Sequence, residues 1–425
     1  MKEISFTQLK KKIIDRSESV NSIKINKVVK KIIQDIRKNG NKALLKYVRK
    51  FENPKATTKT LVISKKKIEQ AYNSISIDQK KALKLAYSRI FKYHKQQLKK
   101  NQKFKDDLDT IFMVKWNAIQ NVGLYIPGGL ASYPSTVLMT AIPAKIAGVQ
   151  NIMLTVPSSK GKISNLTLAA AHLCKVNQIF NMGGAHAIAA LAFGTKTIQK
   201  VNKIFGPGNQ YVVEAKRQLF GTIGIDLPAG PSEVLILSDN SSNPKWIASD
   251  ILAQAEHDPK AKTYLVSNSK IMINKVQKEI KNLKKLNNFK NIDKSIKNES
   301  FAILAKNQSE MAQISNFIAP EHLHIQLKNT KIIENKIINA GSVFIGSHNS
   351  VALGDYTIGT NHVLPTDQSA KYSSGLSVED FMKKTVFVKT GKRTFKKIAQ
   401  STIELAKSEG LEAHALSIEI RSSKS

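Results

Sequence analysis

The hydrophobic pattern of the chain changes character after roughly the first hundred residues. Over residues 24–51, apolar side chains such as Ile25 and Ile32 recur at intervals of three and four, and residues 75–98 show the same spacing. Such intervals place the apolar side chains on one face of a helix. The pattern therefore predicts that the first 105 residues are helical.

Beyond residue 120, short apolar runs that are typical of strands alternate with helical segments. The expected strands are 122–126, 151–156, 178–182, 203–205, 233–237, 263–266 and 301–305. The helices expected between them are 135–147, 165–174, 185–193, 209–220, 244–256 and 309–317. Strands separated by helices of this length indicate βαβ units and parallel sheets.

The sequence therefore predicts an α/β protein with two Rossmann-like domains and small appendages at both ends. Both domains are incomplete as Rossmann folds because the motif G-x-G-x-x-G is absent. The expected segments are an N-terminal helical segment 1–20, a first α/β domain made of 21–120 with 233–320, a second made of 121–232 with 321–375 that carries the nucleotide-binding turns, and a C-terminal tail 376–425. Within this tail we expect a strand at 385–388, a helix at 394–408 with Gly410 as its C-cap, and a final strand.

Charge is the most conspicuous feature of the composition, with 67 basic against 31 acidic residues and a formal net charge of +36 over 425 residues. Only seven of the basic residues are arginine, the residue that base and phosphate recognition favours. Lysines are dense at 260–298 but nearly absent at 117–157. We therefore interpret the charge as compositional drift towards lysine and expect no nucleic-acid partner.

Cysteine usage and hydropathy restrict the class of protein further. The single Cys174 excludes a disulfide framework and a cysteine-based zinc cluster. No apolar run approaches the ~18 residues of a membrane span, and the N-terminus lacks the apolar core of a signal peptide. We expect a cytoplasmic protein with no membrane partner.

Two glycine-rich turns are candidates for a nucleotide site. Gly183-Gly184 and Gly206-Pro207-Gly208 each follow an expected strand and begin an expected helix. Backbone N–H groups and the helix dipole at such a turn suit a pyrophosphate. The alternative, tight strand-to-helix turns without a ligand, is equally compatible with the sequence.

Polar residues that could perform chemistry fall into four short segments. Gln254 and His257 share one face at the end of a helix, and Glu321-His322 places a carboxylate beside an imidazole in a loop before a strand. The segments around Asp355, with Gly359-Thr360-Asn361-His362 after it, and around Glu409 and His414 complete the set. Taken singly, the helix end and the loop pair are better explained as solvated polar positions.

The chain as a whole resembles histidinol dehydrogenase. The resemblance covers nearly all of it and is carried by blocks in order at 122–149, 183–194, 204–218, 226–235, 249–257, 319–323, 340–346 and 354–365, among them GGAHAIAALAFG, SDILAQAEH and GDYTIGTNHVLP. It implies a fold similar to that of the aldehyde dehydrogenases. It also implies an enzyme that uses NAD⁺ and one Zn²⁺ per subunit to oxidise L-histidinol, through bound L-histidinaldehyde, to L-histidine. This reaction consumes two NAD⁺ and ends histidine biosynthesis.

The resemblance also implies roles for individual residues. Glu321 and His322 would be the catalytic pair. The zinc ligands would be Gln254, His257, Asp355 and His414. Contacts to the substrate would come from Ser232, Gln254, His257, His322, Asp355, Glu409 and His414. Contacts to NAD⁺ would come from Tyr125, His186 and Asn209, where the family usually has Gln at the position of His186. In an intertwined homodimer, with residues 376–425 as its dimerisation tail, Glu409 and His414 would come from the partner subunit.

The residues themselves favour a particular route for the second oxidation. An aldehyde must become a thiohemiacetal or a hydrate before it can lose a hydride, and Cys174 lies far from every motif in the sequence. We therefore expect a hydrate, with His322 as the base for the hydroxyl proton and Glu321 activating water. A zinc hydrolase built on Glu321 would leave the glycine-rich turns without a role. A nucleic-acid-binding protein would rest on net charge alone.

Overall fold

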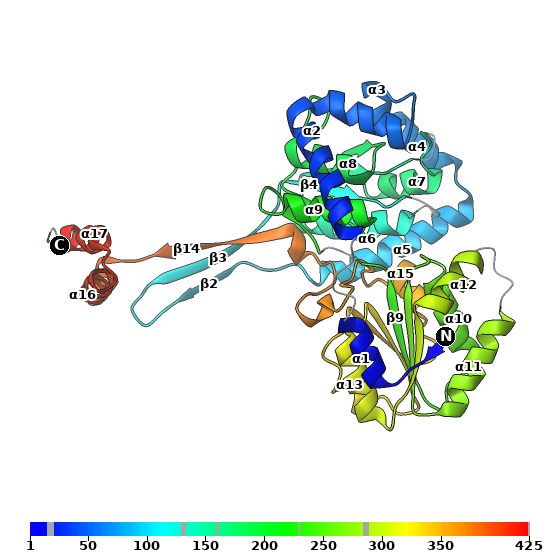
Figure 1. The fold of residues 1–425 in the computed structure, drawn as a ribbon. Helices are drawn as coiled ribbons and strands as arrows, with labels where there is room; N and C mark the ends of the chain where they lie inside the picture. Colours follow the sequence, from blue (N-terminus) through cyan, green and yellow to red (C-terminus); the bar gives the residue numbers. More distant parts are fainter. Residues whose placement is uncertain (15–20, 129–132, 159–160, 228–229, 284–288, 424–425) are drawn as a thin grey trace.

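Two parallel β-sheets and a projecting arm make up the molecule (Figure 1). The computed structural model describes residues 1–14, 21–128, 133–158, 161–227, 230–283 and 289–423. The α/β class and the parallel sheets predicted from the sequence are confirmed. None of the helices in these ranges is long and apolar enough to cross a membrane.

The first sheet has five parallel strands in the order β6-β5-β4-β7-β8. Their bounds are β4 (Asn121–Tyr125), β5 (Asn151–Thr155), β6 (Gln178–Phe180), β7 (Lys203–Phe205) and β8 (Gly224–Ile225). The helices that follow the strands are α6 (Pro134–Ala147), α7 (Asn165–Leu173), α8 (Gly184–Phe193) and α9 (Gln210–Leu219). Helices α6 and α8 are apolar around most of their circumference and almost fully buried, as expected for helices enclosed between a sheet and a further layer.

That further layer comes from the N-terminal helices. They are α2 (Asn21–Phe51), α3 (Thr58–Leu61), α4 (Lys65–Ser74) and α5 (Ile77–Lys95). One hydrophobic cluster joins α4 and α5 to α6 and α7, and a second joins α2 to α8 and α9. The five-stranded sheet is therefore covered by two layers of helices.

The second sheet has six parallel strands in the order β1-β11-β10-β9-β12-β13. Their bounds are β1 (Lys2–Glu3), β9 (Glu233–Ser238), β10 (Lys262–Ser267), β11 (Ser300–Leu304), β12 (His322–Gln326) and β13 (Ser342–Ile345). The flanking helices are α1 (Phe6–Ile14), α10 (Pro244–Ala255), α11 (Lys270–Asn282), α12 (Phe289–Asn298), α13 (Gln308–Ile318), α14 (Lys331–Glu334) and α15 (Val351–Tyr356). Every residue of β9, β10 and β12 is buried, as expected for central parallel strands covered on both faces.

The arm extends away from both sheets and ends in two helices (Figure 1). It consists of β2 (Gln102–Lys105), β3 (Ile111–Ala118) and β14 (Met382–Lys389), followed by α16 (Lys392–Ser408) and α17 (Glu412–Ser423), with short 3-10 turns at Ser369–Lys371 and Glu379–Phe381 before it. β14 pairs antiparallel with β3 along eight residues. Large apolar side chains remain exposed on the arm, among them Val386, Phe387, Leu405 and Leu416.

The structure divides the chain differently from the expected domain boundaries. Residues 21–95, which were expected to join 233–320, pack instead on the five-stranded sheet formed by 121–225. Strands β12 and β13, which were expected to join 121–232, belong instead to the six-stranded sheet. Residues 1–3 add an edge strand to the second sheet, and 15–20 of the expected N-terminal segment lie outside the described residues. The final strand expected near the C-terminus is wrong, because that segment is helix α17.

Candidate active site

Glu321 and His322 are adjacent at the start of β12, and the backbone of Glu233 on the neighbouring strand β9 binds both of them. The Glu233 N–H donates to Oε2 of Glu321 at 2.8 Å, and Nδ1 of His322 lies 3.1 Å from the Glu233 carbonyl oxygen. Because a carbonyl oxygen only accepts, this contact assigns the ring proton to Nδ1. Nε2 of His322 is then the basic atom, and it lies 3.8 Å from Oδ1 of Asp355.

Burial shifts the two side chains in opposite directions. Both are almost inaccessible to solvent. Burial raises the pKa of Glu321 well above its ordinary value and lowers the pKa of His322 to about 4. At neutral pH His322 is therefore neutral, with Nε2 ready to accept a proton. Once ionised, Glu321 is a stronger base than an exposed carboxylate.

Asp355 faces this pair from α15. Gly354 lets the helix approach β13 closely, since a Cβ there would lie 2.4 Å from the Phe344 ring. Desolvation raises the pKa of Asp355 to about 7. Its ion-pairing neighbours in the described part of the chain are His322 at 3.8 Å and His362 at 4.0 Å, both buried with pKa values lowered to about 4. This buried carboxylate therefore lacks a cationic partner.

His362 belongs to the site although the sequence assigned it no role. Its Nδ1 contacts the backbone oxygen of Asp355 at 3.0 Å, and its Nε2 lies 3.3 Å from Oγ1 of Thr136. The signal available in the sequence was the motif Gly359-Thr360-Asn361-His362, in which no single residue could be preferred. His362 and Asp355 lie on one side of His322.

Gln254 and His257 come from the end of α10, which contacts α15. Gln254 is buried and His257, two residues past the helix, is exposed. His257 is close enough to His322 and His362 for its charge to lower their pKa values. The structure thus places His257, Glu321, His322 and Asp355 near one another, and Gln254 lies beside His257, whose N–H its carbonyl oxygen accepts at 3.3 Å.

The side chains of this site could supply three of the four ligands of a zinc ion. Gln254, His257 and Asp355 offer two oxygens and a nitrogen, which are acceptable to Zn²⁺, and the Asp355 carboxylate is only 18% exposed and has two imidazoles as its ion-pairing neighbours among the described residues. Within the described ranges, no group of three or more His, Cys, Asp or Glu is arranged to hold a metal. Gln254, His257 and Asp355 are three donors, one fewer than the four that Zn²⁺ usually takes, so this set needs one further ligand.

Glu409 and His414 are not brought to this site within one chain. Both are exposed at the tip of the arm, on either side of Gly410, away from the two sheets (Figure 1). Ser232 precedes β9 directly and is half-buried, and its carbonyl oxygen accepts the Lys262 N–H at 2.9 Å. It is adjacent in sequence to Glu233.

The residues predicted to contact NAD⁺ lie at the carboxyl ends of strands in the first sheet. Tyr125 ends β4, and its hydroxyl oxygen accepts the Gly184 N–H at 3.1 Å. Burial raises the pKa of Tyr125 to about 12, so the phenol stays neutral. His186 is buried in the first turn of α8, and Asn209 caps α9 through its own side chain.

Carboxylates of the chain itself bind the glycine-rich turns. Oε1 of Glu52 accepts the Gly183 N–H at 2.9 Å, and Oδ2 of Asp226 accepts the Gly206 N–H at 2.6 Å. Asp226 is in turn paired with the buried Lys216. The N–H groups that the sequence offered to a pyrophosphate are thus engaged internally, which favours the alternative of tight structural turns.

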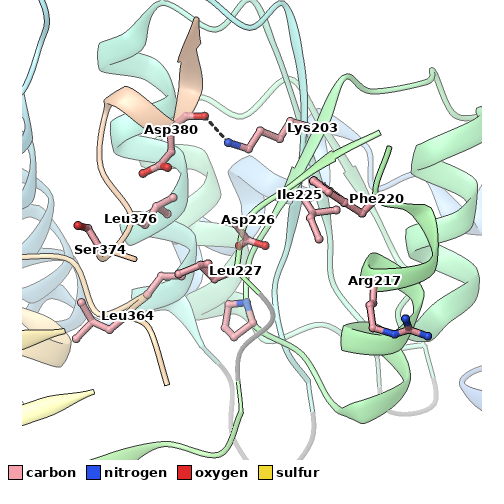
Figure 2. A pocket seen from close by; sticks show the side chains of 12 residues that line it. Lys203, Arg217, Phe220, Ile225, Asp226, Leu227, Leu364, Ser374, Leu376 and Asp380 are labelled. Carbon is pink, nitrogen blue, oxygen red and sulfur yellow. Dashed lines mark hydrogen bonds between the residues drawn. The ribbon is translucent and has the colours of Figure 1, made fainter. Parts of the chain in front are cut away.

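Two further features lie apart from the candidate residues. A cavity of about 430 Å³ lies beside β8, α9 and the 363–380 connection, and Lys203 at its edge donates to the Asp380 carbonyl oxygen at 2.9 Å (Figure 2). Among the described residues that line it, none is a candidate site residue. Cys174 is fully buried in the hydrophobic cluster that joins α4 and α5 to α6 and α7, and burial raises the pKa of its thiol to about 12.

Parallel α/β sheets, with a buried imidazole and carboxyl at the start of one strand, define an α/β enzyme that performs acid–base chemistry. The family model for histidinol dehydrogenase matches residues 15–422, and the chain belongs to this family. It is 44% identical over 398 residues to the histidinol dehydrogenase of Brucella suis biovar 1 (strain 1330), covering 93% of both chains. It is 45% identical over 408 residues to that of Pelagibacter ubique (strain HTCC1062), covering 95% of this chain and 94% of the other.

A solved structure agrees with these relatives. The crystal structure of histidinol dehydrogenase from Elizabethkingia anophelis matches with a TM-score of 0.90 and 35% identity, covering 96% of this chain and 93% of that one. The resemblance inferred from the sequence is confirmed. The chain is therefore an oxidoreductase of histidine biosynthesis, from a family that uses NAD and zinc.

Proposed function

We propose that this chain oxidises L-histidinol to L-histidine in two steps, through a bound aldehyde, at the site formed by α10, the start of β12 and α15. The observation that carries the proposal is the Glu321–His322 pair, which the backbone of Glu233 holds in place opposite Asp355. Each of the two steps delivers a hydride to a separate NAD⁺. We also propose that the fold relationship extends to the aldehyde dehydrogenases.

His322 removes the hydroxyl proton in both steps. The contact of Nδ1 with the Glu233 carbonyl oxygen leaves Nε2 as the accepting atom, and the lowered pKa keeps the ring neutral before the reaction. As the alcohol proton moves to Nε2, the carbinol carbon can release its hydride. Nε2 gives this proton to the aldehyde oxygen as water adds, and the same atom then accepts a proton from the aldehyde hydrate in the second step.

Glu321 activates the water that hydrates the aldehyde. Its buried carboxyl has a raised pKa, so the ionised form draws a proton from water more strongly than an exposed carboxylate would. A thiohemiacetal route is disfavoured because Cys174 is fully buried in the core of the first sheet. Hydration is therefore the route that the side chains of this site support.

Gln254, His257 and Asp355 of one subunit, with His414 of the partner subunit, would hold the zinc ion. Bound there, zinc would orient the imidazole and amine of histidinol as a template. The buried carboxylate of Asp355 supports this assignment. Ser232, His322 and the partner subunit's Glu409 would complete the contacts to the substrate.

The position of the arm supports a homodimer in which Glu409 and His414 of each subunit contribute to the site of the other subunit. The arm carries Glu409 and His414 away from the site of their own chain, and its exposed apolar side chains would be covered by a second copy (Figure 1). We propose Tyr125, His186 and Asn209 as the NAD⁺ contacts. All three lie at the carboxyl end of the first sheet.

The stoichiometry of NADH production tests the proposed reaction. Purified protein supplied with L-histidinol and NAD⁺ should form two NADH per L-histidine, and a chelator should abolish the activity. Formation of one NADH with release of the aldehyde would contradict the two-step route. Absence of NADH would contradict the proposal altogether.

Mixing inactive subunits tests the shared site. His322→Asn and His414→Asn homodimers should each be inactive, because each lacks one component in both sites. A mixed dimer should regain one intact site and about half the specific activity of the wild-type dimer. Exchange verified with two affinity tags but without recovered activity would contradict a site built from two subunits.

A further inference from the structure

A buried polar network lies behind the site and is used by none of the steps above. Asp250 on α10 is 8% exposed, and His324 and Gln326 on β12 are 0% and 3% exposed. Oδ2 of Asp250 lies 3.2 Å from Nδ1 of His324 and accepts from Nε2 of Gln326 at 3.2 Å. A buried carboxylate costs several kcal/mol unless such partners compensate it.

The same carboxylate also reaches a third element. Its Oδ1 accepts a hydrogen bond from Oγ of Ser350 at 2.7 Å, and Ser350 is the residue directly before α15. His324 extends the network further, because its Nε2 lies 3.0 Å from the carbonyl oxygen of Gly346, just past β13. Asp250 therefore connects α10, β12 and the start of α15 through side chains.

These three elements are the ones that carry the proposed site. Asp250 lies one helical turn before Gln254, so both project from the same side of α10. His324 lies two residues after His322, on the same face of β12. Ser350 lies five residues before Asp355. Asp250, His324 and Ser350 are thus each within about a turn, or two strand positions, of a proposed ligand or base, and Gln326 lies four positions after His322 on the same strand.

We propose that Asp250 is a positioning residue that holds α10 and α15 against β12, so that Gln254, His257 and Asp355 converge on one metal ion. This inference rests on the zinc site in the proposed function. Neither Asp250 nor Ser350 belongs to the proposed donor set, so both act through the elements they fix. Groups that hydrogen-bond directly to metal ligands change metal affinity 10–100-fold when they are removed, and the Asp250 network acts one step further from the metal, so we expect the lower end of this range.

The test is the affinity of the full-length protein for Zn²⁺, measured by competition with a chromophoric chelator and without any activity assay. Ser350→Ala removes only the bond to α15 and should weaken zinc binding about tenfold. Asp250→Asn should weaken it at least as much. Ser350→Thr retains the hydroxyl and should bind zinc like the wild-type protein.

Ser267→Ala is the matched control. Ser267 is fully buried at the end of β10 in the same sheet and donates to the Ser238 carbonyl oxygen at 2.9 Å, at the opposite end of β9 from the register partner of His322. It should lose a comparable amount of stability while retaining wild-type zinc affinity. This comparison separates positioning from general destabilisation.

The outcomes distinguish the inference from the proposed function. If folded Ser350→Ala and Asp250→Asn proteins bind zinc as tightly as Ser267→Ala, or if Ser350→Thr is as weak as Ser350→Ala, the positioning role is overturned and the metal site stands. If the wild-type protein itself takes up no zinc, the proposed metal site is overturned and the inference falls with it.

Discussion

Glu52 offers a direct test of how the carboxyl end of the first sheet is held together. It follows the last residue of α2, and its side chain is only 9% exposed. Oε1 accepts the Gly183 N–H at 2.9 Å and lies 3.0 Å from Nε2 of His186. Oε2 accepts the Ser158 N–H at 3.3 Å. One carboxylate thus joins α2, the start of α8 and the end of the β5 region.

Replacing Glu52 by Ala leaves three buried or half-buried donors without their acceptor. Each such donor costs ~1–3 kcal/mol, and water that enters the vacated space recovers part of it. We expect Glu52→Ala to lower the free energy of unfolding by about 3 kcal/mol. Glu52→Gln keeps one oxygen for the Gly183 N–H but places an amide opposite the Ser158 N–H, so it should lose about 1 kcal/mol.

Equilibrium urea unfolding at one fixed protein concentration measures these differences. Glu69→Ala on α4 is the matched control, because it removes an exposed carboxylate and should change the free energy of unfolding by less than ~0.5 kcal/mol. The expected order of stability is wild type, then Glu52→Gln, then Glu52→Ala. A Glu52→Ala protein within ~1 kcal/mol of Glu69→Ala would refute the reasoning, because the contacts would then contribute little.

Three further substitutions test separate parts of the structure. His186→Gln should retain NAD⁺ binding with an altered contact and shift the Michaelis constant for NAD⁺; an unchanged constant would mean that position 186 contributes nothing to affinity. Burial lowers the pKa of His94 below its ordinary 6.5, so the unfolded chain binds the proton first and folding stability falls as the pH drops below 6.5. His94→Gln should therefore lose less stability than the wild type between pH 7 and pH 5 in urea unfolding, and equal losses would contradict this. Cys174→Ala should retain full NADH formation with histidinol, whereas its loss would point to a thiol intermediate.

The spacing of apolar residues predicted the helices and strands whose formation depends mainly on residues close in sequence. The alternation of strands and helices from residue 121 onwards is visible in the sequence because each parallel strand is a short apolar run, such as β9, and each helix has its own period. The adjacency of Glu321 and His322 was likewise readable. Their shared dependence on the backbone of Glu233 was not, because β9 and β12 become neighbours only through the order of strands in the sheet.

The predictions from the sequence were wrong where the structure depends on contacts between distant residues, or where the spacing of apolar residues suits both a strand and a helix. Residues Leu416, Ile418 and Ile420 alternate with polar residues as in a strand, yet the segment is helix α17, which packs on α16 through Ala415. The packing of 21–95 on the first sheet could not be read from their helical period, which shows an apolar face but not its partner. For the same reason no role could be predicted for His362, because its contact with the backbone of Asp355 is visible only in the folded chain.

The internal carboxylates also bear on how the cofactor is recognised. Glu52 and Asp226 occupy the N–H groups of the two glycine-rich turns, and a phosphate at either turn would meet a negative charge instead of free donors. Asn209 likewise satisfies the first N–H groups of α9 with its own side chain. At these two turns, N–H groups that could bind a phosphate are therefore already bonded within the chain, which also lacks the motif G-x-G-x-x-G. If Tyr125 and His186 contact NAD⁺ as proposed, recognition of the cofactor would rest on side chains at this edge of the sheet, and the exchange of Gln for His at position 186 would alter one of those contacts.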